Sequence, residues 1–143
     1  MIVVDTTVLV YAVGGDHALR DPARALLTAA AGGVVRATTT PEAIQEFAHA
    51  RTRRRDRSDA AALAESYADL LSPLLEVSEA DLREGLRLFE RSDTLGAFDA
   101  VLAAVALRAR ATTLVSADRA FAGVSGLAFA DLDGFDMERL YTA

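Results

Sequence analysis

The chain has 143 residues, the length of one domain, and 52% of them are hydrophobic, which excludes a disordered protein. It has no Cys, so disulfides, thiolate metal sites and Cys nucleophiles are excluded; all 15 basic residues are Arg, which also excludes a Walker A lysine and Schiff-base chemistry. The net charge of −6, taken alone, argues against a nucleic-acid partner.

The N-terminal segment begins directly with an apolar run, Ile2-Val3-Val4, with no basic region before it. We therefore expect no signal peptide. No apolar run reaches the roughly 18 residues that a membrane helix needs. We expect a cytoplasmic protein without a membrane segment, organised as a single domain over residues 1–143.

The first half of the chain alternates between strand and helix patterns. Asp21-Pro22 and Thr40-Pro41 are typical helix starts, because Pro at the first helical position loses no hydrogen bond. In chain order we expect a strand over 2–4, helices over 6–13 and 22–31, a strand over 34–38, and a helix from Pro41 that runs into an arginine cluster.

The second half continues the same alternation. Ser78 with Asp81 has the spacing of a capping box at a helix start. We expect a helix capped by Ser58 and closed by Pro73, a strand over 74–77, a helix from Ser78 to about Arg91, an alanine-rich helix over 97–110, and strands over 112–115 and 127–130.

This alternation predicts an α/β fold, in which a mostly parallel sheet of about five strands is covered by helices on both faces. Sheets of this kind bind ligands beyond the carboxyl ends of their strands.

Four acidic residues fall where such a sheet would bring them together. Asp5 ends the first strand and Asp118 follows the strand over 112–115, while Glu46 and Asp99 lie early in helices. Each has a simpler explanation alone: Asp5 and Asp118 as helix caps, Asp99 as an acid at a helix dipole, and Glu46 as a solvated helix residue. Their joint placement favours one shared site.

Other folds with strand-end acids fail specific tests. A haloacid dehalogenase needs a second Asp two residues after the first, where Thr7 stands, and a receiver domain needs a Lys. A dinucleotide site needs Gly-x-Gly-x-x-Gly after the first strand, which Asp5-Thr6-Thr7 does not match.

Four segments together resemble the motifs of PIN-domain nucleases, especially VapC-type toxins of bacterial toxin–antitoxin pairs. They are Ile2 to Leu9, Ile44 to Phe47, Ala97 to Ala104 and Leu114 to Phe121, in matching order over nearly the whole chain. The resemblance implies a three-layer α/β/α fold, divalent-metal ribonuclease activity, a homodimer and a cognate VapB-type antitoxin. The family usually has Ser or Asn where Thr7 stands, and some members have a further acid after the fourth motif that Ala122-Gly123-Val124 lacks.

The acidic residues also predict their own chemistry. Clustered carboxylates repel one another unless they are protonated or bind a cation, and an all-oxygen ligand set favours Mg²⁺, with Mn²⁺ as a substitute. We expect Asp5 and Asp99 to bind the metal directly, with Glu46 and Asp118 holding its waters. Such a metal can bridge a substrate phosphate and activate water. Hydrogen bonds from Thr6 or Thr7 and Ser116 should orient the carboxylates.

Five arginines between Arg51 and Arg57 carry the densest positive charge in the chain. If the helix persists, Arg53 and Arg57 lie near the face of Glu46 and can reach substrate phosphates. The alternatives are an acidic antitoxin segment or solvent alone. Further candidate substrate contacts are Thr7, Ser116 and His49, whereas His17 is expected at the surface.

The function expected from all of these residues is a Mg²⁺-dependent endoribonuclease that cleaves cellular RNA and is neutralised by an antitoxin. The alternatives are a non-catalytic PIN-like module that binds RNA or a protein partner, and a DNA-directed nuclease. The intact set of four acids favours the enzyme.

Overall fold

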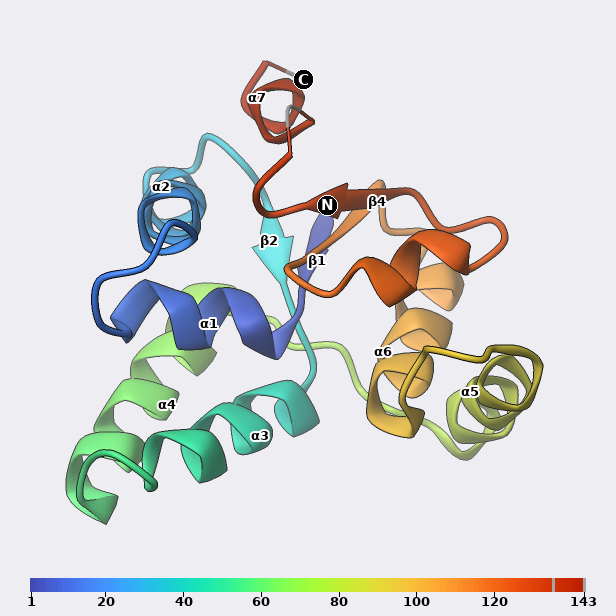
Figure 1. Cartoon of the computed structure of the whole chain (residues 1–143), viewed down its shortest axis with the longest axis horizontal. Coiled ribbons are helices and arrows are strands. Elements are labelled where there is room, and N and C mark those ends of the chain that lie inside the picture. Colours follow the sequence, from blue (N-terminus) through green and yellow to red (C-terminus); the bar gives the residue numbers. More distant parts are fainter. Residues whose placement is uncertain (135, 143) are drawn as a thin grey trace.

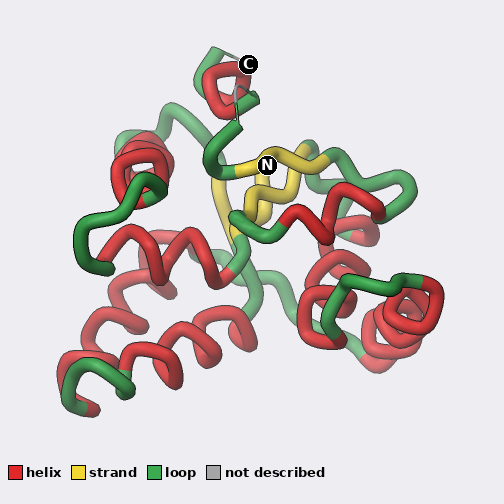
Figure 2. The backbone as a smooth tube through the Cα atoms, viewed as in Figure 1, coloured by secondary structure: helices red, strands yellow, loops and turns green. Residues whose placement is uncertain are grey.

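The computed structural model describes residues 1–134 and 136–142 and has a parallel sheet at its centre (Figures 1 and 2). The sheet has four strands in the order β2 (Ala37–Thr38), β1 (Ile2–Val4), β3 (Thr113–Ser116) and β4 (Phe129–Asp131), and every neighbouring pair is parallel. The α/β expectation is confirmed, with four strands in place of about five.

Helices cover both faces of this sheet, which makes three layers (Figure 1). One side carries α1 (Thr6–Val13), α2 (Arg20–Ala31), α3 (Pro41–Arg51) and α4 (Arg57–Leu71); the other carries α5 (Glu79–Arg91) and α6 (Ala97–Arg108). The 3₁₀ helix η1 (Arg119–Gly123) follows β3, and the short α7 (Met137–Leu140) lies near the C-terminus. Within these described elements, none is long and apolar enough to cross a membrane.

The two cores follow from the alternation of side chains along β1. Ile2 and Val4 point into a core built with α1 to α4, and Val3 points into a second core built with α6 and η1. All three side chains are buried, as expected for a central parallel strand.

Helix starts agree closely with the predicted caps. The Thr40 hydroxyl accepts from the Ala43 N–H at 3.2 Å, directly before Pro41. Ser78 and Asp81 form a reciprocal capping box, in which Asp81 Oδ2 accepts from the Ser78 N–H at 2.8 Å. Asp81 also binds Arg108 at the end of α6, so the same cap ties α5 to α6.

The segment Leu74 to Val77 is not a strand, and that prediction is wrong. The Leu75 N–H donates to the Thr39 carbonyl at 2.9 Å, but Thr39 already lies beyond the end of β2. The segment therefore runs beside the sheet without a ladder of backbone hydrogen bonds. The strand expected over 34–38 is likewise reduced to its last two residues, Ala37–Thr38.

The arginine cluster does not continue α3, which corrects a second expectation. Backbone bonds from Arg53 to Ala50 and from Arg54 to Arg51 close the helix into a turn. Asp56, rather than Ser58, caps α4, because its carboxylate accepts from the Asp59 N–H at 2.8 Å. Because Asp56 caps a helix only a few residues after the end of α3, α4 begins there as a separate helix.

Candidate active site

The four predicted carboxylates come from four segments that meet at the carboxyl ends of β1 and β3. Asp5 follows β1 directly, Asp118 lies two residues after β3, Asp99 is in the first turn of α6, and Glu46 is on α3. Asp5, Asp118 and Glu46 all lie close enough to Asp99 to repel its negative charge. The structure therefore brings all four together, as the sequence predicted.

Asp5 is buried and held through one of its two carboxylate oxygens. Oδ2 accepts from the Ser116 hydroxyl at 2.7 Å, from the Thr7 hydroxyl at 2.9 Å and from the Thr7 N–H at 3.4 Å, which makes Asp5 the N-cap of α1. Within the described residues, Oδ1 accepts no hydrogen bond. One oxygen thus fixes the side chain and leaves the other for a ligand.

Ser116 also links Asp5 to Asp118. Its hydroxyl group donates to Asp5 Oδ2, and its oxygen accepts from the Asp118 N–H at 2.9 Å. The Asp118 carboxylate accepts from the Ala120 N–H at 2.9 Å and caps η1. Asp5 and Asp118 therefore cap α1 and η1 and still lie beside Asp99, so capping is compatible with a place in a shared cluster.

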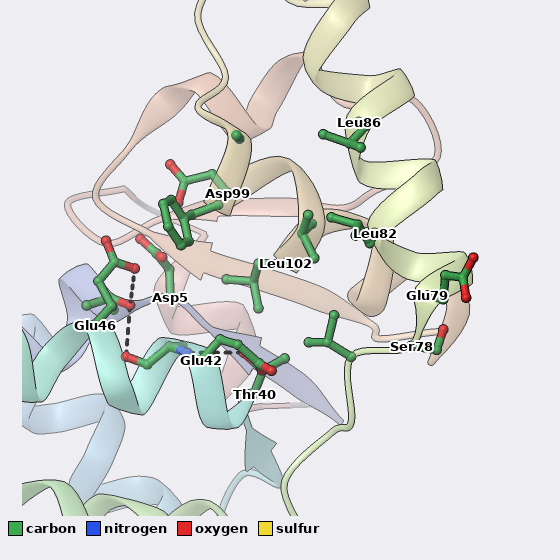
Figure 3. Close-up of a pocket in the computed structure, with 16 residues that line it drawn as sticks. Asp5, Thr40, Glu42, Glu46, Ser78, Glu79, Leu82, Leu86, Asp99 and Leu102 are labelled. Atoms are coloured by element: carbon green, nitrogen blue, oxygen red, sulfur yellow. Dashed lines mark hydrogen bonds between the residues drawn. The ribbon is translucent and has the colours of Figure 1, made fainter.

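Glu46 is exposed on α3 and oriented by Thr6. The Thr6 hydroxyl lies 3.0 Å from Glu46 Oε2 and 3.1 Å from the Ala43 carbonyl (Figure 3). A hydroxyl has one proton, so it donates to one of these acceptors at a time. The exposed glutamate is thus the most adjustable of the four acids.

The surroundings of Asp99 make its negative charge unfavourable and shift its pKa. Burial, followed by repulsion from Asp5, Asp118 and Glu46, raises the pKa of Asp99 from 3.8 to about 7. A hydrogen bond with the Asp118 carboxyl also favours the protonated form. At neutral pH the cluster therefore holds a proton or attracts a cation in its place.

A cavity of about 490 Å³ opens beside the acids, and its far wall is apolar (Figure 3). Leu82 and Leu86 of α5 line it opposite Glu46, and Phe98, next to Asp99, is 78% exposed. This apolar wall was not predicted from the sequence. The signal for it was the spacing of Leu82 and Leu86, which places both side chains on one face of α5.

The acids suit a hard divalent cation by their chemistry, because every donor is a carboxylate oxygen and Asp5 offers an unbonded one. In residues 1–134 and 136–142, no three Asp, Glu or His side chains are already arranged as a metal-ligand set. Burial and the neighbouring carboxylates both raise the pKa of Asp99, so a bound cation would stabilise the charged form of the cluster.

The lesser candidate contacts divide into two groups. Ser116 is fully buried with its hydroxyl engaged, so the expectation that it touches substrate is wrong; it positions Asp5. Thr7 is half-buried and also bonded to Asp5. Arg53 and Arg57 are exposed and line two separate hollows. Neither residue is in α3, the helix of Glu46, so the predicted shared helical face does not exist.

Known proteins are similar to this chain over most of its length. The sequence pattern of the PIN domain matches residues 2–127. Ribonuclease VapC7 of Mycobacterium tuberculosis is 59% identical over 126 residues, which cover 87% of this chain and 87% of the relative. Ribonuclease VapC23 of the same species is 35% identical over 124 residues (85% and 96%), and Ribonuclease VapC13 is 29% identical over 127 residues (89% and 97%). The chain belongs to the PIN-domain family, in its VapC branch.

Proposed function

We propose that this protein is an endoribonuclease toxin that hydrolyses RNA phosphodiester bonds with Mg²⁺, or Mn²⁺ in its place, at Asp5, Glu46, Asp99 and Asp118. Ribonuclease activity follows from its membership of the VapC branch, where relatives at 59% and 35% identity are ribonucleases. The observation that carries the metal dependence is the raised pKa of Asp99, which marks a site where a cation would replace a proton.

Each acid has a distinct task in this proposal. Asp5, fixed through Oδ2, and Asp99 would hold the metal, which when bound supplies an activated water and stabilises the leaving oxygen. Glu46 is exposed and adjustable, so it suits orienting the attacking water and accepting its proton. Asp118 is held at its backbone by Ser116 and keeps its carboxyl beside Asp99.

We propose three partners: an RNA substrate, a VapB-type antitoxin and a second copy of this chain. We also propose that the protein is cytoplasmic and that residues 1–143 form a single domain. The exposed apolar side chains Leu82, Leu86, Phe89 and Phe98 support the homodimer, because they lie on one side of the molecule around α5 and the start of α6.

The decisive experiment substitutes Asp99→Asn, which keeps the shape of the side chain and removes its charge. We expect it to abolish RNA cleavage in Mg²⁺, with unchanged far-UV circular dichroism. Asp93→Asn is the matched control, because Asp93 is exposed in the loop before α6, and it should cleave like the wild type.

Three outcomes would contradict the proposal. Cleavage by Asp99→Asn at the wild-type rate would remove Asp99 from the site. A wild-type protein that binds RNA but never cuts it, with any divalent metal, would favour the non-catalytic binding module. Equal rates in Ca²⁺ and Mg²⁺ would count against a precisely held metal, because Ca²⁺ accepts looser geometry.

A further inference from the structure

A second pocket lies away from the acids, between the end of α1 and the end of α3, and has a volume of about 490 Å³. Its wall is built from apolar groups, among them Val10 and Phe47, while Tyr11 and His17 supply rings and Arg53 and Arg54 supply charge. The volume lies in the range of small-ligand pockets. Neither the family match nor the acidic site accounts for this combination.

Arg51 forms the fixed part of this pocket. Its Nε donates to Asp59 at 2.8 Å and its Nη1 to the Val13 carbonyl at 3.4 Å, and its side chain is only 13% exposed. Arg51 thus ties the end of α3 to α4 and to the end of α1. Its guanidinium is therefore already engaged and is not available to a ligand of this pocket.

Arg53 and Arg54 differ from Arg51, because both are exposed and, in the part of the chain that the structure describes, neither forms an ion pair. Asp16 is the acid on the pocket wall, and its carboxylate lies 3.6 Å from Arg20, so it is already partnered. Two guanidiniums at the rim are thus available to an anion of suitable geometry, such as a phosphate.

His17 and Tyr11 form the aromatic part of the pocket. Their ring centroids are 4.7 Å apart with an interplanar angle of 34°. His17 Nδ1 accepts from the Leu19 N–H at 3.1 Å, which fixes the ring, and the residue is exposed. An exposed, fixed ring beside two arginines is suited to stacking a nucleobase while its phosphate is bound.

The pocket also lies on a path from the acids. α1 begins at Thr6, beside Asp5, and α3 carries Glu46; the two helices contact each other and run from the sheet toward the same side of the molecule (Figure 1). Ala50, on the pocket wall, is one helical turn beyond Glu46, about 6 Å along the axis. A single RNA strand can therefore reach both sites within a few nucleotides.

We propose that this pocket, defined by Tyr11, His17, Arg53 and Arg54, is a nucleotide subsite that holds one unpaired base of the RNA a short distance from the scissile bond. The proposal rests on the proposed ribonuclease function. A single compact hollow with a stacked ring fits one base better than a peptide, which needs a sheet edge or a long groove.

The test measures binding of a short, labelled, single-stranded RNA of mixed sequence by fluorescence anisotropy at several salt concentrations. All proteins carry Asp99→Asn, so that the RNA stays intact. The double variant Arg53→Ala/Arg54→Ala should bind more weakly and reduce the salt slope by about 1.4, at roughly 0.7 per lost single-strand phosphate contact. The matched control is Arg55→Ala/Arg91→Ala, which removes the same charge from exposed residues outside the pocket and should keep the slope.

His17→Ala separates base stacking from charge. It should weaken binding about 5-fold or more while leaving the salt slope unchanged, because a stacked base contributes at least about 1 kcal/mol. In a series of RNAs with one abasic position each, one position should weaken binding to the protein with His17 and have no further effect on His17→Ala. That pattern would place one base against this ring.

The possible results distinguish a failure of the nucleotide subsite from a failure of the proposed ribonuclease function. Pocket variants that match the control in slope and affinity would overturn the subsite, while cleavage by the protein with Asp99 intact would leave the proposed function standing. Variants that keep RNA binding but escape neutralisation by the antitoxin would show a protein-docking surface and also overturn the subsite. A protein that neither binds nor cuts RNA would overturn both.

Discussion

At the scale of single residues, Asp99 shows which of two opposing effects is larger. Its place in the first turn of α6 lets the helix dipole stabilise a negative charge, an effect of about 0.3–1 kcal/mol. Burial and three neighbouring carboxylates act in the other direction and raise the pKa of Asp99 to about 7, and each pKa unit corresponds to about 1.4 kcal/mol. Burial and the neighbouring carboxylates together outweigh the helix dipole, so a negative charge on Asp99 is disfavoured despite its place at the start of α6.

This raised pKa predicts how stability depends on pH in EDTA. Between the unfolded value of 3.8 and the folded value of about 7, the folded protein binds the extra proton, so the free energy of unfolding falls as pH rises through that window. Asp99→Asn removes this loss, and we expect it to be more stable than the wild type at pH 8 by about 1–3 kcal/mol, after allowance for solvent screening. Near pH 4 the two should agree. Chemical denaturation at both pH values measures the difference, and a variant no more stable at pH 8 would contradict it.

Ser116 gives a second prediction at this scale, because one hydroxyl oxygen joins two acids. Ser116→Ala removes the donor to Asp5 and leaves the Asp118 N–H without its acceptor. We expect weaker Mg²⁺ binding and cleavage reduced about 10- to 100-fold, the usual effect of losing a group that orients metal ligands. Ser116→Thr keeps the hydroxyl and should restore part of the loss. Ser66→Ala, which removes an exposed helical hydroxyl, should change neither measurement.

At the scale of elements, the close packing of α5 on α6 depends on Gly85. A Cβ at this position would lie 2.7 Å from the Val101 Cα, too close for backbone atoms of the neighbouring helix to accommodate. Gly85→Ala should therefore destabilise the protein by about 1–3 kcal/mol, although Ala is the better helix former by about 1 kcal/mol. Gly123→Ala is the control, because its Cβ would meet no atom within 4 Å. Thermal unfolding compares the two, and equal melting temperatures would refute the close contact.

Elements with local signals were predictable from the sequence, and elements decided by distant contacts were not. The Thr40 and Ser78 caps and the strand Ile2–Val4 carry their signals within a few residues. Leu74 to Val77 has strand composition, but whether it pairs depends on where β2 ends, and β2 is only two residues long. The start of a new helix after the arginines was predicted, but its cap was placed at Ser58 rather than Asp56, because both residue types are good N-caps and only the bond to the Asp59 N–H distinguishes them.

The acidic site was predictable for a related reason. Strand ends set the positions of Asp5 and Asp118, and parallel pairing of β1 with β3 brings those ends to one edge. The apolar wall opposite Glu46 was not predictable in this way, because exposure of Leu82 and Leu86 depends on how α5 is rotated against α6. Gly85 and the Asp81–Arg108 ion pair fix that rotation.

At the scale of the whole molecule, the exposed apolar side predicts self-association. Leu82, Leu86 and Phe89 are each 45–47% exposed along one face of α5. Leu86→Glu/Phe89→Glu should convert the proposed homodimer to a monomer, because two charges would be buried without partners. Val34→Glu alters another exposed apolar residue, before β2, and should leave the dimer intact. Light scattering distinguishes these states, and a monomeric wild type at micromolar concentration would refute the dimer.

The strand order has a consequence for synthesis on the ribosome. β1 is made first, yet one of its two neighbours in the sheet is β3, and the hydroxyl that orients Asp5 belongs to Ser116, 111 residues later. A nascent chain shorter than 118 residues lacks at least one of the four carboxylates. Contacts this distant in sequence also form slowly. The proposed active site can therefore assemble only after β3 and Asp118 have been synthesised, and a growing polypeptide that ends before this point does not yet contain it.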